Sequence, residues 1–207
     1  MDARGIVYER FAATGAPPSA GEAAAALGLP VDALLAEWRA LHDAHQIVLN
    51  EAGDAIRMAH PFSAAPMGFV VRGGDRLWWG GCAWDSFGIA AALDEELEIE
   101  TRCPGCGREL RYAAGPETAP PELTLRLPRP AAEWWDDVVA TCTDIRMFCA
   151  PEHAPAGGAL VPAEVMWRLA RSWYGNRLDP DYMPLSTERK RSLLADLGLD
   201  GPFWQLP

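Results

Sequence analysis

Two thiols lie on a short segment, Cys103-Pro104-Gly105-Cys106-Gly107, that its proline and glycines force into a tight turn. Residues 97–102 before this turn and residues 109–112 after it are predicted to be strands. A redox-active pair with this spacing usually opens a helix after a strand, so a strand-turn-strand context favours metal binding by the two thiolates. Because a structural metal site needs four ligands, the fold would have to bring two further ligands to this turn.

A second pair of metal-binding side chains lies at short spacing in Cys149-Ala150-Pro151-Glu152-His153. Together, Cys103, Cys106, Cys149 and His153 would form a closed tetrahedron of three thiolates and one imidazole. We expect a structural zinc ion at these residues. The alternatives are a reduced surface pair and a redox-sensitive pair of cysteines.

The composition limits the compartment and the partners. Five cysteines, an odd number, are distributed over a chain of 207 residues whose first residues lack the basic and apolar pattern of an export signal. We therefore expect a cytoplasmic protein with reduced thiols. The net charge of −11 argues against nucleic acid and against an anionic membrane surface as partners. No apolar run approaches the roughly 20 residues that span a bilayer, and nothing in the sequence specifies an oligomeric state.

The first 60 residues are predicted to form three helices followed by a hairpin, which is the winged-helix plan. Residues 4–13 carry an apolar stripe, and Ser19 with Glu22 forms a capping-box pattern at the start of the second helix. Residues 31–45 form the third helix, in the place of a recognition helix. That helix is acidic, so we expect a structural module rather than a DNA-binding one.

The junction at residues 59–63 separates this unit from a segment in which short strands and helices alternate. The predicted fold class is α+β: a winged-helix-like three-helix domain (residues 1–60), then a mixed, mainly antiparallel sheet domain with flanking helices (residues 61–160). A helical C-terminal extension (residues 161–207) follows. Strands are predicted at residues 68–71, 77–81, 97–102, 109–112, 123–127 and 145–148, and helices at residues 83–93, 162–173 and 186–198.

The segment Cys82-Ala83-Trp84-Asp85 is a candidate reactive site. A thiol between a strand and a helix can have a lowered pKa, because a helix N-terminus favours a thiolate. A carboxyl group three residues later lies on the same helical face and reaches the same ligand. A buried structural cysteine followed by a capping aspartate would fit the same residues.

Residues 141–149 hold two more thiols, Cys142 and Cys149. Thiols on separate segments can meet in space and bind a soft metal ion. The alternative is two small buried residues in a strand. The pairs Trp78-Trp79 and Trp134-Trp135 flank the cysteine segments, which predicts apolar, aromatic surroundings for the thiols.

Over roughly residues 1–155 the order of these features resembles the alkylmercury lyase family. The resemblance rests on the winged-helix-like start, the junction Ile56–Ser63, the Trp-rich strand that runs into Cys82-Ala83-Trp84-Asp85, and the segment from Cys142 to Phe148. It implies an enzyme that cleaves a carbon–mercury bond of a small organomercurial without a catalytic cofactor. Cys82 would attack the mercury first and Cys142 would add to it as the second thiol, while Asp85 would take up a thiol proton and deliver it to the carbon.

The sequence departs from the family pattern at three places. When Phe148 is aligned with the family's aromatic strand, Thr143 rather than Cys142 occupies the second cysteine position. The Cys103/Cys106 turn and the C-terminal extension are additional. The alternatives are therefore a divergent member with another thiol-dependent reaction and a non-catalytic protein that binds a soft metal.

Overall fold

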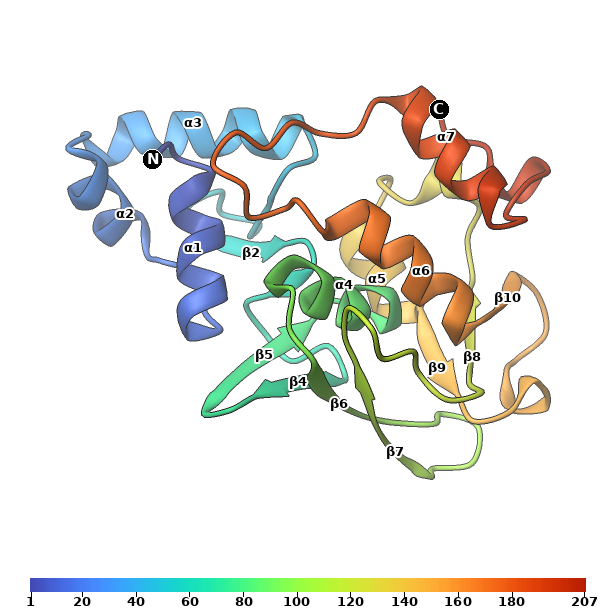
Figure 1. Cartoon of the computed structure of the whole chain (residues 1–207). Coiled ribbons are helices and arrows are strands. Elements are labelled where there is room, and N and C mark those ends of the chain that lie inside the picture. The colour runs from blue at the N-terminus through green and yellow to red at the C-terminus, as the bar shows by residue number, and fades with distance from the viewer.

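The N-terminal part of the computed structural model, which describes residues 1–207, consists of three helices and a hairpin (Figure 1). They are α1 (Gly5–Thr14), α2 (Ala20–Leu27), α3 (Val31–Asp43), β1 (Val48–Leu49) and β2 (Ile56–Ala59). The capping box at α2 is present, since the Ser19 hydroxyl accepts from the Glu22 amide and the Glu22 side chain accepts from the Ser19 amide. The three helices and the hairpin follow the predicted order, while their description as a winged helix stays a prediction.

The large sheet contains seven strands in the order β1-β2-β3-β5-β4-β6-β7, and all of its pairs are antiparallel. The further strands are β3 (Phe62–Ser63), β4 (Phe69–Gly73), β5 (Arg76–Gly80), β6 (Leu97–Arg102) and β7 (Glu109–Ala114). The N-terminal hairpin pairs with β3 and so extends the sheet of the following segment. Hydrogen bonds therefore cross the predicted domain boundary near residue 60.

A second, three-stranded antiparallel sheet has the order β10-β8-β9. Its strands are β8 (Thr124–Leu127), β9 (Arg146–Phe148) and β10 (Ala159–Pro162), and the helices of this half are α4 (Ala83–Leu93), α5 (Val138–Asp144), α6 (Ala163–Tyr174) and α7 (Thr187–Asp196). Short 3₁₀ turns lie at Ala131–Glu133, Pro151–His153 and Pro202–Trp204. None of the helices has the length and apolar character needed to cross a membrane. The antiparallel sheets with flanking helices confirm the predicted α+β class.

The packing of α4 against α6 positions the functional side chains. Nine residues of α4 are buried, and α4 lies beneath α6 in Figure 1. A Cβ atom at Gly88 would lie 2.6 Å from a ring carbon of Tyr174 and 2.7 Å from a carbon of Pro61. Only a glycine at this position therefore lets α6 and the His60–Pro61 junction approach α4 so closely.

Helix α1 ends against the large sheet, and this contact predicts a difference between two cap glycines. Gly15 and Gly28 both end a helix with a positive φ, but only Gly15 touches another element. A Cβ atom at Gly15 would lie 1.9 Å from the Leu77 carbonyl oxygen, whereas nothing lies within 4 Å of one at Gly28.

We expect Gly28→Ala to lower the free energy of unfolding by about 1–2 kcal/mol, the cost of a left-handed alanine. Gly15→Ala should lower it by about 1–3 kcal/mol more, because the added methyl group also overpacks the contact with β5. Urea denaturation of the two variants measures the difference. Equal losses of stability would contradict the close packing of α1 on β5.

Candidate active site

Cys82 lies between β5 and α4, as the sequence predicted. It is the N-cap residue of α4, and its Sγ accepts a hydrogen bond from the Asp85 amide at 3.3 Å. Its side chain is buried in the core. The thiol therefore occupies the place that a serine or aspartate side chain takes at most helix starts.

Two glycines before Cys82 allow this turn to close over Asp85. A Cβ atom at Gly81 would lie 2.5 Å from Asp85 Oδ2 and 2.5 Å from Met58 Cε. A Cβ atom at Gly80 would lie 3.2 Å from the backbone of Ser86. The glycine pair thus brings the strand end against the first turn of α4 and leaves room for the carboxyl group.

Cys142 faces the same point from α5. Its Sγ lies 3.8 Å from Asp85 Oδ2, to which it donates, and 3.4 Å from His60 Nε2. The neighbouring Thr143 is exposed, and its hydroxyl donates to the Val139 carbonyl within the helix. The structure therefore brings Cys142, and not Thr143, to Cys82 and Asp85.

Asp85 is buried, and each of its oxygens has a different neighbour. Oδ1 accepts a hydrogen bond of 2.7 Å from the Tyr174 hydroxyl, and Oδ2 faces Cys142. Burial and the nearby Asp85 charge raise the pKa of Tyr174 well above its ordinary value, so the phenol keeps its proton and remains a donor. Tyr174 thus fixes the carboxyl group and leaves Oδ2 directed at the thiol.

The two thiols of the site differ in acidity. Burial raises the pKa of Cys82 well above its ordinary value, and Cys142 and Asp85 raise it further. The hydrogen bond from Cys82 lowers the pKa of Cys142 in spite of burial, and His60 lowers it further. The expected lowering of the Cys82 pKa is therefore wrong, because burial outweighs the single backbone amide at the helix start. Cys142 is the thiol that ionises more easily.

A cavity of roughly 350 Å³ opens onto these groups. Cys82, Asp85, Cys142 and His60 line it, and its walls include six Trp and Tyr side chains: Trp84, Trp134, Trp135, Trp173, Tyr174 and Tyr182. The predicted aromatic surroundings are thus present. Of the two tryptophan pairs, Trp134-Trp135 lines the cavity, whereas Trp78 is buried elsewhere and donates to the Phe11 carbonyl.

Three cavity residues that lie near the thiols or Asp85 were not among the predicted site residues: His60, Tyr174 and Arg177. His60 lies at the recognised junction, and the other two lie in the segment that the sequence marked as an extension. Arg177 is buried in the cavity wall, and no carboxylate forms a salt bridge with it. The aromatic and basic residues between positions 173 and 177 were the one feature of the sequence that could have indicated a site there. Only the tertiary structure shows that this segment faces Asp85.

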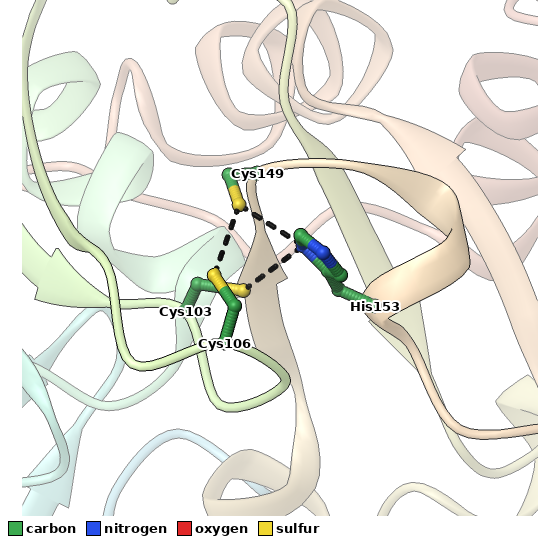
Figure 2. A group of neighbouring side chains, drawn as sticks. All are labelled: Cys103, Cys106, Cys149 and His153. Carbon is green, nitrogen blue, oxygen red and sulfur yellow. Dashed lines mark hydrogen bonds between the residues drawn. The ribbon is translucent and has the colours of Figure 1, made fainter.

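The four predicted metal ligands form a separate cluster at the ends of β6 and β9. The ligand atoms of Cys103, Cys106, Cys149 and His153 all lie within 4.8 Å of one another. Figure 2 shows the three sulfur atoms and the imidazole turned toward one another. The structure therefore separates the five cysteines into a pair that lines the cavity, Cys82 and Cys142, and a second group of three.

A model of the alkylmercury lyase family matches residues 62–175, more than half of the chain. The chain therefore belongs to the alkylmercury lyase family, whose members are enzymes that cleave carbon–mercury bonds. The matched residues include Cys82, Asp85, Cys142 and Tyr174, whereas His60 and Arg177 lie just outside them.

A solved structure with a similar fold is the crystal structure of the mercury-bound form of MerB2. It superposes with a TM-score of 0.62 at 19% sequence identity, over 85% of this chain and 89% of that chain. At this identity the likeness shows a shared fold. No curated protein sequence matches the chain significantly.

The hydrogen bond from Tyr174 to Asp85 predicts a loss of rate without a loss of mercury binding. In Tyr174→Phe, Asp85 Oδ1 loses its donor, and hydrogen bonds to charged groups contribute about 1.5–3 kcal/mol. We expect the turnover number for an organomercurial to fall about 10-fold or more, while Hg²⁺ affinity stays near that of the wild type. Tyr112→Phe is the control, since that buried hydroxyl has no hydrogen bond to Asp85. Equal rates in wild type and Tyr174→Phe would contradict an orienting role.

Proposed function

We propose that Cys82, Asp85 and Cys142 together cleave the carbon–mercury bond of an organomercurial by protonolysis. The observation that carries this proposal is the meeting of two thiols at one buried carboxyl group in an aromatic cavity. Soft sulfur ligands suit a soft metal, and a buried carboxyl group beside the thiols can carry a proton between them and the substrate carbon.

The first step is the binding of R–Hg⁺ to the Cys142 thiolate. Three observations support Cys142 as the first ligand. It is the more acidic thiol, it lies 3.4 Å from His60, and it is 5% exposed whereas Cys82 is 1% exposed. This order reverses the one that the family resemblance implied for Cys82 and Cys142.

The second step adds Cys82 to the same mercury atom. Its proton passes to Asp85 Oδ2, which lies on the Cys142 side of the carboxyl group. Two sulfur ligands increase the negative charge on the carbon, and Asp85 returns the proton to that carbon as the carbon–mercury bond breaks. The products are R–H and Hg²⁺ held by two thiolates, so protons and charges balance, and Asp85 ends as it began.

The walls of the cavity favour this chemistry. Aromatic side chains exclude water from the carboxyl group and the thiols, and electrostatic interactions are stronger where water is excluded. They also offer an apolar surface to the organic group of the substrate. Specificity for the organic group would therefore depend on Trp84, Trp134, Trp135 and Trp173.

We place the reaction in the cytoplasm, where low-molecular-weight thiols are abundant and protein thiols stay reduced. All five cysteines are free thiols in this structure. Small thiols can enter the cavity and remove the bound Hg²⁺, which restores Cys82 and Cys142 for another turnover.

The residue assignment predicts a distinct defect for each variant. Cys82→Ser and Cys142→Ser should abolish turnover, because a hydroxyl is neither a soft ligand nor ionised at neutral pH. Asp85→Asn should still bind Hg²⁺ but lose about 10²–10⁴-fold in rate, the usual contribution of general acid–base catalysis. Hydrocarbon release from a simple organomercurial in excess thiol measures turnover.

Thr143→Val is the matched control for Cys142→Ser. Thr143 adjoins Cys142 in the same helix, but its side chain is exposed and bonds only to the Val139 carbonyl. We expect full turnover in Thr143→Val. Full turnover in Cys142→Ser together with its loss in Thr143→Val would overturn the assignment of the second thiol.

We infer that the N-terminal helices support the cavity and do not bind DNA. The Tyr8 hydroxyl of α1 lies 3.2 Å from the His60 carbonyl, to which it donates, and 2.9 Å from that of Gln46. Helix α3 presents Asp32, Glu37 and Asp43, and negative charges repel phosphate groups. We expect no shift of duplex DNA in a gel at physiological salt. A salt-sensitive shift at submicromolar protein would contradict this inference.

A further inference from the structure

Three thiols and an imidazole converge outside the catalytic cavity, from two different sheets. Cys103 directly follows β6 and Cys106 lies in the turn before β7, whereas Cys149 directly follows β9 and His153 ends the 3₁₀ turn Pro151–His153. The two pairs are thus supplied by the large sheet and by the three-stranded sheet (Figure 1).

The backbone holds both pairs in place. The turn is closed by hydrogen bonds of 2.9 Å from the Gly107 amide to the Cys103 carbonyl and from the Cys103 amide to the Arg108 carbonyl. A Cβ atom at Gly105 would lie 2.3 Å from the His153 carbonyl oxygen and 2.7 Å from its Cβ. Only glycine at this position lets the turn lie directly against His153.

The spacing of the ligand atoms matches a tetrahedral metal site. With zinc–sulfur bonds of about 2.3 Å, two thiolates of a tetrahedral site lie roughly 3.8 Å apart. Cys106 and Cys149 are 3.5 Å apart, Cys103 lies 3.8 Å from His153 Nδ1, and Cys149 lies 3.1 Å from the same atom (Figure 2). A disulfide requires a sulfur–sulfur bond of about 2.0 Å, so these cysteines are thiols.

We propose that Cys103, Cys106, Cys149 and His153 bind one zinc ion with a structural role. Three thiolates and one imidazole are a ligand set that zinc uses in closed structural sites, and a site with four protein ligands keeps no position for a substrate. The proposal is independent of the lyase reaction, because none of these four residues lines the catalytic cavity.

The zinc ion would also fix the segment that carries the second catalytic thiol. Between Cys142 and Cys149 the chain passes through Ile145, whose carbonyl accepts from the Ala83 amide at 3.2 Å, beside Cys82. Strand β9 then leads directly to Cys149. The stretch from Ile145 to Cys149 is thus held at one end by the start of α4 and at the other by the metal ligands. Because α5 directly precedes this stretch, zinc would restrain the position of α5 relative to Cys82.

Metal analysis of the native protein tests the proposal. Protein produced with zinc in the medium and purified without chelators should contain about one zinc per chain, and its exchange for Co²⁺ should give the spectrum of a tetrahedral, thiolate-ligated ion. Cys106→Ser should lose the zinc without leaving a cavity in the core, because Cys106 is exposed. Cys142→Ser is the matched control and should keep the zinc.

The outcomes separate this proposal from the proposed function, since metal content is measured without the lyase assay. Native protein that contains no zinc and does not bind added Zn²⁺, iron in place of zinc, or a Cys106–Cys149 disulfide would overturn it. So would full zinc content in Cys106→Ser. Where that variant does not fold, the native protein decides, because zinc released to a chelating dye and the Co²⁺ spectrum need no substitution.

Discussion

Asp85 is a buried carboxyl group whose two oxygens face different partners, and the rest of the site is arranged around it. Tyr174 donates to one oxygen at 2.7 Å, and Cys142 lies 3.8 Å from the other. A buried carboxylate is costly unless it is hydrogen-bonded. The phenol offsets part of that cost and leaves the second oxygen facing Cys142, where the proposed mechanism needs it for proton transfer.

Packing of small residues makes this contact possible. Gly81 lets the strand end pass over the Asp85 carboxyl group, and Gly88 lets Tyr174 lie against α4. The two thiols then differ because their neighbours differ: burial keeps Cys82 protonated, and Cys82 and His60 stabilise the thiolate of Cys142. Because Cys142 ionises more easily than Cys82, the proposed mechanism takes its first mercury ligand from Cys142 and its proton from Cys82.

The sequence predicted the elements with strong local signals and missed those that depend on tertiary contacts. Helix α4 follows a glycine pair and strand β6 alternates apolar and polar residues, and both were predicted with their observed bounds. Helix α5 was missed, because it is short and begins with two valines, which favour strands. The approach of Tyr174 to Asp85 spans 89 residues, and no local pattern encodes it. The pKa of Cys82 follows burial, which spacing alone does not reveal.

The central claim is that Cys82 and Cys142 hold the mercury while Asp85 delivers the proton. A crystal structure of the protein after one turnover with an organomercurial, in the absence of small thiols, tests it most directly. The account predicts one Hg²⁺ bound by the sulfur atoms of Cys82 and Cys142, next to the carboxyl group of Asp85. Mercury bound only at Cys103, Cys106 and Cys149, with the cavity thiols free, would contradict it.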